Sequence, residues 1–391
     1  MLQIVLKATV ILSIIQTPQS VYGDTSMQSK FVCSLKSAPG NPRNSEGAFI
    51  QLRNGQVAYL YSCYHGESWD DHSSAELAVR ISGDNGKTWS GAPLTVIRKE
   101  PGMLNLMSVS LLRLHSGKIA LVYLCKKKNG GDIDCHPVIR FSSDEGQSWS
   151  DPRQIIPSPG YYVVNNDRMI QLKNGRLLLP AAFHSQTAGR LHPQAVSCMF
   201  YSDDEGACWS EAPQRLYPEP DNQSGFQEPG VVELSDGAVM QWCRTDCGCQ
   251  YKAFSRNGGL SWSPVVPAPE FPSPLSPLSI KRCPYNGDLY AVWNDHHPDR
   301  RVDFLESSMQ RTPLVIARSQ DDGQTWHEHR ILENDRAKGY AYTAMLFLDH
   351  SLLLGYCCGS GGNGGNMLQD SCIRKITLPQ WTASNILEKK S

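Results

Sequence analysis

The sequence predicts an all-β fold, a six-bladed β-propeller of four-stranded antiparallel blades, and three observations carry this prediction. First, 32 Gly, 25 Pro and 9 Trp among 391 residues indicate a chain rich in turns and strands rather than helices. Second, a Ser-x-Asp-x-Gly-x-x-Trp box occurs five times. Third, two apolar runs around a short turn recur six times, out of phase with the box.

The box has the composition of a tight turn. Its copies begin at Ser82, Ser142, Ser202, Ser255 and Ser319, and Asn257 replaces Asp in the fourth. An Asp or Asn side chain accepts hydrogen bonds from turn amides, and Gly adopts positive φ without strain. Apolar runs such as AELAVRIS and PLVIARS precede the boxes. We therefore expect each box to join the two outer strands of one blade, with its Trp packed back as an apolar plug.

The second repeat predicts the inner hairpin of each blade. Its copies read LRNGQVAYL, LHSGKIALVYL, LKNGRLLLP, LSDGAVMQW, YNGDLYAVW and LDHSLLLGY, and His350 takes the place of Gly in the last. A unit of about 60 residues accommodates four strands with their loops. The sixth unit is short of an outer strand, so we expect residues 30–37 to pair beside residues 371–378 and close the ring. A β-solenoid prefers shorter repeats, and a seven-bladed ring would need a further blade.

The first residues have the pattern of a secretory signal peptide. Lys7 is the one charge between Met1 and Gly23, and an apolar run from Ala8 to Ile15 follows it. This run is too short to span a bilayer. We therefore expect residues 1–23 to be a signal peptide and residues 24–391 to form one propeller domain. The product should be secreted or periplasmic, without a membrane span.

Composition excludes several classes of protein. With 37 Lys+Arg against 38 Asp+Glu, the chain lacks the basic field of a nucleic-acid binder, and 40% hydrophobic residues exclude wholesale disorder. The 13 Cys show no zinc-site spacing, which favours structural or disulfide cysteines over metal ligands. We expect no metal, no cofactor and a monomer.

Polar residues stand at the start of the predicted inner strands. Counting nine residues back from each turn reaches Glu46, Ser108, Asn166 and Glu228, with Leu278 and Ala341 near the same phase. Inner strands of a propeller line its axis, so these positions predict a converging polar site. The alternative is that they satisfy open backbone groups at strand ends.

On these motifs the chain resembles the sialidase (neuraminidase) superfamily, whose Asp-box matches the five-fold box. The resemblance implies a Glu and Arg pair on adjacent strands, here Glu228 in QEPGVVELSDG and Arg244 in MQWCRT. It assigns a second carboxylate-binding Arg to Arg311 in RTPLVIARSQDDG, and the nucleophile to Tyr342. The acid/base Asp falls in WDDHSSAELAVR, where Asp71 is slightly favoured over Asp70.

One position departs from the family pattern. Sialidases begin the first inner strand with an Arg, and here Glu46 stands in that phase. Arg43 lies three residues earlier and is one candidate to replace the cation. Further candidates are Arg168 in NNDR, and Lys281 and Arg282 in SIKR.

The resemblance implies retaining hydrolysis of a terminal sialic acid or related acidic sugar from a glycan or glycoconjugate. Tyr342 would attack the anomeric carbon while Glu228 takes its proton, and Asp71 would protonate the leaving oxygen and later activate water. Arg244 and Arg311 would bind a carboxylate through planar, bidentate contacts. Two alternatives stay open. One is a propeller glycosidase or polysaccharide lyase for another sugar, and the other is a non-catalytic carbohydrate-binding propeller.

Overall fold

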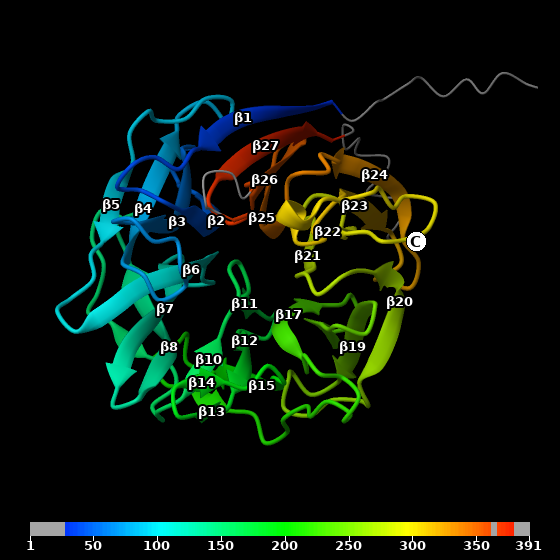
Figure 1. The fold of residues 1–391 in the computed structure, drawn as a ribbon, viewed down its shortest axis with the longest axis horizontal. Coiled ribbons are helices and arrows are strands. Elements are labelled where there is room, and N and C mark those ends of the chain that lie inside the picture. The colour runs from blue at the N-terminus through cyan, green and yellow to red at the C-terminus, as the bar shows by residue number, and fades with distance from the viewer. Residues whose placement is uncertain (1–27, 361–365, 379–391) are drawn as a thin grey trace, which may run out of the picture.

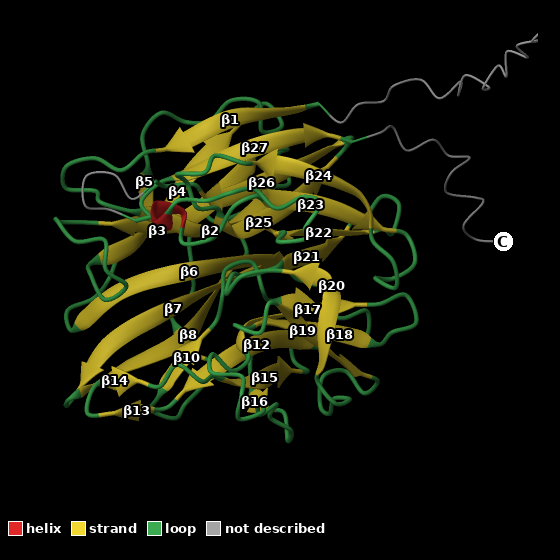
Figure 2. Ribbon diagram, turned by 45° about the vertical axis from the view of Figure 1, so that its right-hand side comes forward, coloured by secondary structure: helices red, strands yellow, loops and turns green. Residues whose placement is uncertain are grey.

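The computed structural model describes residues 28–360 and 366–378, and strands dominate these ranges (Figures 1 and 2). The one helical element in them is the 3-10 turn η1 (Glu306–Ser308). The predicted all-β class is therefore confirmed. No helix in the described ranges is long and apolar enough to cross a bilayer. The predicted signal peptide, residues 1–23, lies outside the described residues.

Three four-stranded sheets each correspond to one sequence repeat, with strands in chain order. The first holds β2 (Asn44–Gln51), β3 (Val57–Tyr64), β4 (Ala75–Ser82) and β5 (Leu94–Ile97). The second holds β17 (Gln227–Glu233), β18 (Val239–Arg244), β19 (Cys249–Ser255) and β20 (Val266–Pro272). The third holds β21 (Ser279–Arg282), β22 (Leu289–Asn294), β23 (Leu314–Ser319) and β24 (His327–Glu333).

A nine-stranded sheet spans the second and third repeats, which join where β10 pairs in parallel with β8. Its members from the second repeat are β6 (Met103–Arg113), β7 (Ile119–Asn129), β8 (Asp132–Ser142) and β9 (Arg153–Gln154). Those from the third are β10 (Tyr161–Val163), β11 (Ile170–Gln171), β12 (Leu177–His184), β15 (Val196–Ser202) and β16 (Ser210–Glu211). A separate hairpin, β13 (Gln186–Thr187) and β14 (Arg190–Leu191), follows β12.

The last sheet joins the two ends of the described chain. It contains β25 (Ala341–Leu348), β26 (Ser351–Cys357), β27 (Ser371–Thr377) and β1 (Ser29–Leu35). β1 pairs antiparallel with β27, from Ser29 opposite Ile376 to Leu35 opposite Ser371, which confirms the predicted pairing. β25 also contacts β2. In Figure 1 the sheets follow one another around a common centre, with β1 and β27 side by side.

All five boxes form the predicted turn between the two outer strands of a repeat. In the first, Ser82 Oγ donates to Asp84 Oδ1 at 2.8 Å, and Gly86 N donates to Ser82 Oγ at 2.8 Å. Thr88 N donates to Asp84 Oδ1 at 2.8 Å. Asn257 accepts from Ser255 Oγ in the same way, at 2.9 Å. The box Trp side chains pack against the apolar clusters between sheets.

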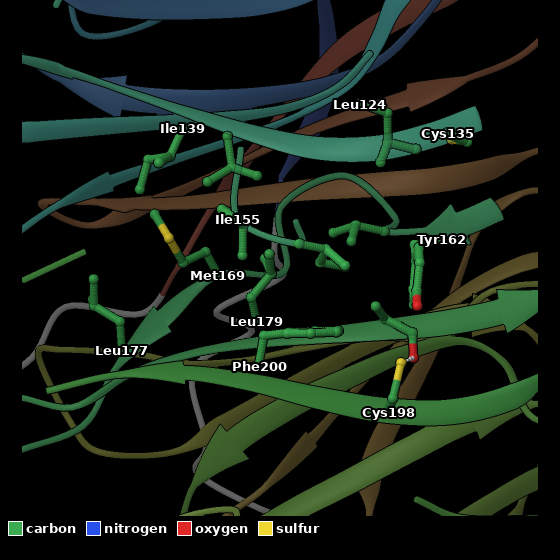
Figure 3. Close-up of a cluster of buried hydrophobic side chains, with 14 of the residues drawn as sticks. Leu124, Cys135, Ile139, Ile155, Tyr162, Met169, Leu177, Leu179, Cys198 and Phe200 are labelled. Atoms are coloured by element: carbon green, nitrogen blue, oxygen red, sulfur yellow. Dashed lines mark hydrogen bonds between the residues drawn. The ribbon is translucent and has the colours of Figure 1, made fainter. Parts of the chain in front are cut away.

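The apolar core lies between strands of neighbouring repeats. Figure 3 shows Leu124 and Ile139 of the second repeat pointing toward Leu179 and Phe200 of the third. All 13 cysteines are free and most are buried, including Cys198 in this cluster. This agrees with a structural role, and no disulfide contributes.

The third repeat departs from the predicted regular inner strand. The inner strand was expected to begin at Asn166, but residues 164–169 lie between β10 and β11 and outside both strands. These residues bond to the preceding repeat instead, because Asp167 N donates to Val109 O and Arg168 N donates to Ser110 Oγ, both at 2.9 Å.

Candidate functional site

The first strands of four repeats carry the same backbone irregularity near the centre. Glu46, Ser108, Glu228 and Tyr342 have φ of 49°, 57°, 44° and 61°, and the pairing register shifts at each of them. Positive φ strains a residue with a side chain, and bulges of this kind re-aim side chains beside functional sites. All four residues line one cavity.

That cavity has a volume of about 320 Å³. Asp71 and Arg244 also line it, so residues from the first, second, fourth and sixth repeats meet there. Of the positions predicted from the phase of the repeats, Glu46, Ser108 and Glu228 line this cavity, whereas Asn166, Leu278 and Ala341 do not.

Tyr342, Glu228 and Arg244 form one hydrogen-bonded cluster in the cavity. Tyr342 Oη donates to Glu228 Oε1 at 3.1 Å, and Arg244 Nη1 donates to Glu228 Oε2 at 2.9 Å. Arg244 Nη1 is also 3.5 Å from Tyr342 Oη. Gln227 Oε1 accepts from Arg244 Nε and Nη2 at 3.0 and 2.6 Å, which fixes the guanidinium plane. Glu228 is thus placed to take the phenol proton.

Burial raises the pKa of Tyr342 to about 12, and the charge of Glu228 acts in the same direction. Arg311 and Arg244 oppose this rise. The phenol is therefore neutral near pH 7 and needs a base such as Glu228 to become a nucleophile.

Arg311, which the resemblance assigns to carboxylate binding, lies beside Tyr342 but does not line the cavity. Its guanidinium carbon is 5.4 Å from the centre of the Tyr342 ring, and only 7% of the residue is exposed. No carboxylate among the described residues forms an ion pair with Arg311. The two carboxylates of the box in the same repeat have other partners, because Asp321 bonds within its box and Asp322 bonds Arg282.

Arg43 is buried, and each nitrogen of its guanidinium donates hydrogen bonds to other protein groups. Nη1 donates to Asp71 Oδ1 at 2.5 Å and to Trp69 O at 3.2 Å. Nη2 donates to Glu46 Oε1 and Nε to Ser45 Oγ, both at 2.9 Å. Arg43 was predicted to bind substrate, but in the structure it does not line the cavity and instead holds two carboxylates that do.

Asp71 lines the cavity and Asp70 does not. The backbone oxygen of Asp71 accepts from Asn105 Nδ2 at 2.7 Å and Lys126 Nζ at 2.8 Å, which fixes the loop against the second repeat. Both side chains are exposed, but Asp70 accepts from His72 N at 2.8 Å and does not line the cavity.

Two opposing effects act on the Asp71 carboxyl. Burial acts to raise its pKa, but the charges of Arg43 and Lys126 outweigh it and hold the pKa of Asp71 well below its ordinary value. Asp71 is therefore ionised near neutral pH and requires an acidic environment or a bound ligand to carry a proton.

Arg168 is buried and does not line the cavity. Nη2 donates to Leu278 O at 2.8 Å and Nη1 to Ser279 Oγ at 3.3 Å. Burial lowers the pKa of Arg168 to about 10. Its predicted contact with substrate would require these bonds to break.

The two cations of SIKR, Lys281 and Arg282, also pair with carboxylates of the protein. Lys281 Nζ pairs with both carboxylate oxygens of Asp167 at 2.9 Å, and Arg282 Nη2 pairs with Asp322 Oδ1 at 2.6 Å. Neither lines the cavity.

The sequence argument missed several cavity residues, among them Lys126, Tyr161, His184 and His192. Lys126 begins the run KKKNG, which has the composition of a solvated hairpin, yet Lys126 is only 2% exposed. His184 ends the apolar run LLLPAAFH, and a polar residue at the end of a buried strand was the available signal.

The model of the BNR repeat-like domain family matches residues 103–354 of this chain. The chain belongs to the sialidase, or BNR-repeat, superfamily. The anhydrosialidase of Macrobdella decora is 31% identical over 142 residues, which make up 33% of this chain and 16% of that protein. The sialidase of Micromonospora viridifaciens is 30% identical over 214 residues, or 51% of this chain and 30% of that protein. The chain thus spans less than a third of either relative.

Solved structures show the same fold at low identity. A protein of unknown function from Dyadobacter fermentans matches with a TM-score of 0.69 at 18% identity, covering 90% of this chain and 99% of that one. The Hadza microbial sialidase Hz136 matches with a TM-score of 0.66 at 16% identity, covering 87% and 66%.

Proposed function

We propose that this BNR-repeat protein is a retaining, exo-acting glycoside hydrolase of the sialidase type. The observation that carries the proposal is the hydrogen bond from Tyr342 Oη to Glu228 Oε1, 3.1 Å long, in a cavity that also holds Arg244 and Asp71. The sialidases among its relatives support the same class of reaction.

The proposal includes a closed six-bladed propeller. Six inner hairpins in the sequence support it, as does the contact of β25 with β2. The Asn166 amide also donates to Gly47 O at 2.7 Å and to Tyr342 O at 3.0 Å, so it ties the third repeat to the first and the sixth.

In the proposed first step, Tyr342 Oη bonds to the anomeric carbon as its proton passes to Glu228. The glycosidic bond breaks, and Asp71 gives its proton to the leaving oxygen. In the second step Asp71 takes a proton from water, and the water oxygen replaces Tyr342 at the anomeric carbon. Glu228 returns the proton to the phenolate. Two displacements retain the configuration.

The proposed substrate is a terminal sialic acid or a related acidic sugar on a glycan. Arg244, which lines the cavity, and Arg311, which lies over the Tyr342 ring, would supply the cations that a carboxylate requires. A second candidate is a glycosidase or lyase for a different sugar. Glu46 favours it, because this carboxylate lines the cavity where sialidases place an Arg.

The test compares the wild type with Tyr342→Phe on a fluorogenic sialoside. We expect turnover by the wild type and a loss of ~1,000-fold or more in the variant, since the nucleophile is removed. If the wild type is inactive on the sialoside but releases sugars from a polysaccharide panel, the second candidate holds. If ligands bind without any turnover, the protein is a carbohydrate-binding propeller and the enzymatic proposal fails.

We further propose that residues 1–23 direct export to a secreted or periplasmic location and that the mature protein is a single-domain monomer. The apolar run Ala8–Ile15 supports the first statement. N-terminal sequencing of protein recovered from the exported fraction tests it, and light scattering of the purified chain tests the second.

A further inference from the structure

One wall of the cavity is built by a part of the third repeat to which the proposed mechanism gives no role. Tyr161 of β10, His184 at the end of β12, and Leu191, His192 and Pro193 at the β13–β14 hairpin line it. β13 and β14 lie beside β10 in both views (Figures 1 and 2).

The hydrogen bonds of His184 define its tautomer. His184 Nδ1 is 2.9 Å from the backbone oxygen of His192. A carbonyl oxygen only accepts, so Nδ1 carries the proton and, in the neutral ring, Nε2 is an acceptor. No hydrogen bond to Nε2 is found within the described residues, and the ring lines the cavity.

The ring is held in place before any ligand arrives. Tyr161 meets it edge-on, with ring centres 6.3 Å apart. His192 N donates to Ser185 O at 2.9 Å, and His192 Nε2 lies 2.9 Å from Thr187 Oγ1. The His192 carbonyl, which accepts from His184 Nδ1–H, is therefore held in place by the hydrogen bonds of His192 to Ser185 and Thr187.

The hairpin is in turn docked on β8. Gln186 exchanges two hydrogen bonds with the backbone of Ile133, at 3.2 and 2.9 Å, and Gly189 N donates to Asp132 Oδ1 at 2.8 Å. A preorganised acceptor loses little conformational entropy on binding.

Charge decides which ligand group suits this acceptor. Burial lowers the pKa of His184 and the nearby Arg244 acts in the same direction, which together outweigh the opposing effects of the His192 carbonyl and Glu228. A neutral imidazole with a free lone pair repels an anionic oxygen and accepts from a neutral hydroxyl or N–H group.

We propose that His184 Nε2 accepts a hydrogen bond from a hydroxyl or N–H group of the bound sugar. The wall formed by β10, β12 and the β13–β14 hairpin is then a specificity subsite for a neutral donor, separate from the cations beside Tyr342. The inference rests on the proposed function, because it takes the cavity to be a sugar site.

The test is calorimetric binding of free sialic acid and its monodeoxy and deamino derivatives, which requires no turnover. His184→Asn retains a donor near the position of Nδ1 and loses the acceptor. His184→Gln places an amide oxygen near the position of Nε2. We expect a Kd about 5- to 100-fold higher for His184→Asn, the range of one hydrogen bond, and partial recovery for His184→Gln.

The derivative that lacks the group bound by His184 should identify that group. It should bind the wild type as weakly as sialic acid binds His184→Asn, and it should bind the wild type and His184→Asn with equal affinity. A merely structural role of His184 does not produce this pattern. Wild-type affinity in His184→Asn overturns the inference and leaves the proposed function standing. If sialic acid does not bind the wild type, the same comparison uses whichever sugar binds from a panel of hexoses, N-acetylhexosamines and uronic acids. If none binds, both proposals fail.

Discussion

At the scale of single residues, the site depends on how buried charges find partners. Arg43 is only 1% exposed, and a buried cation is stable only when charged or polar groups surround it. Glu46 and Asp71 provide these charged groups, and each forms an ion pair with Arg43. Glu46 therefore stands at the cavity wall as the partner of Arg43 in a buried ion pair.

Asp71 and Asp70 offer a matched pair of substitutions. We expect Asp71→Asn to reduce kcat/KM on the fluorogenic glycoside by about 100-fold or more, the range for removal of a general acid. Asp70→Asn should stay within about 3-fold of the wild type, because its carboxylate faces a loop amide outside the cavity. Steady-state kinetics on both variants measures the two values of kcat/KM. A larger loss of kcat/KM in Asp70→Asn than in Asp71→Asn would assign the general acid to Asp70.

The depressed pKa of Asp71 gives that reaction a pH dependence. The first step needs Asp71 protonated, while Arg43 and Lys126 favour the ionised form. We therefore expect kcat/KM to rise as the pH falls from 7 toward the acidic range, until other carboxylates titrate. A profile that is flat or rises toward alkaline pH would contradict Asp71 as the acid.

At the scale of elements, the Asp-boxes are nearly independent of the rest of the chain. Each Ser, Asp and Gly bonds within five residues, so the turn forms wherever those residue types occur. The inner strands are the opposite case. Their bulges at Glu46, Glu228 and Tyr342 put strained residues with side chains at one centre, and no local pattern requires that.

The fifth box provides a test of stability against pH. Hydrogen bonds from the Thr325 side chain and backbone lower the pKa of Asp321 from 3.8 to about 2. Because the folded pKa is depressed, the stabilisation is present at a pH above the ordinary value of 3.8 and is lost as the pH falls through about 2. Asp321→Asn should keep the turn, as Asn257 does in the fourth box, and lose this dependence.

Urea unfolding at pH 7, 4.5 and 3 measures this effect. The difference in unfolding free energy between the wild type and Asp321→Asn should shrink toward acid pH. Asn257→Asp is the matched control, since it should introduce the same dependence into the fourth box. A difference that stays constant with pH would show that the box carboxylate does not titrate in this range.

At the scale of the whole molecule, the first strand holds the last sheet together. β1 covers the edge of β27, and Arg374 of β27 donates to Ser29 Oγ at 2.7 Å and stacks on Phe31, with 4.1 Å between the guanidinium carbon and the ring centre. Removing β1 would leave β27 as an unpaired edge, which is prone to pair with other chains.

We expect a chain beginning at Ser37 to unfold at a clearly lower temperature and to aggregate, since it lacks β1. A chain beginning at Gln28 retains β1 and should behave as the full chain does. Thermal unfolding and size-exclusion chromatography compare the two. Equal stability of both chains would mean that β1 contributes little to the sheet.

The site was only partly predictable. The resemblance singled out Glu228, Arg244, Arg311 and Tyr342; in the structure the Tyr342, Glu228 and Arg244 side chains hydrogen-bond, and Arg311 lies over the Tyr342 ring. It did not find Lys126, which the sequence presents in a run of three lysines. Nothing local distinguishes the lysine that turns inward from those that remain in water.

The sequence by itself determined the β class, the position of each box turn and the pairing of residues 30–37 with the C-terminal strand. These depend on hydrogen bonds within a few residues or on a missing strand that a regular repeat exposes. Only the tertiary structure decided that Asp71 rather than Asp70 faces the cavity, that Arg43 holds two carboxylates, and that His184 presents a free acceptor. Those outcomes depend on burial and charge among residues far apart in the chain, where the cost of an unpaired buried group selects the partner.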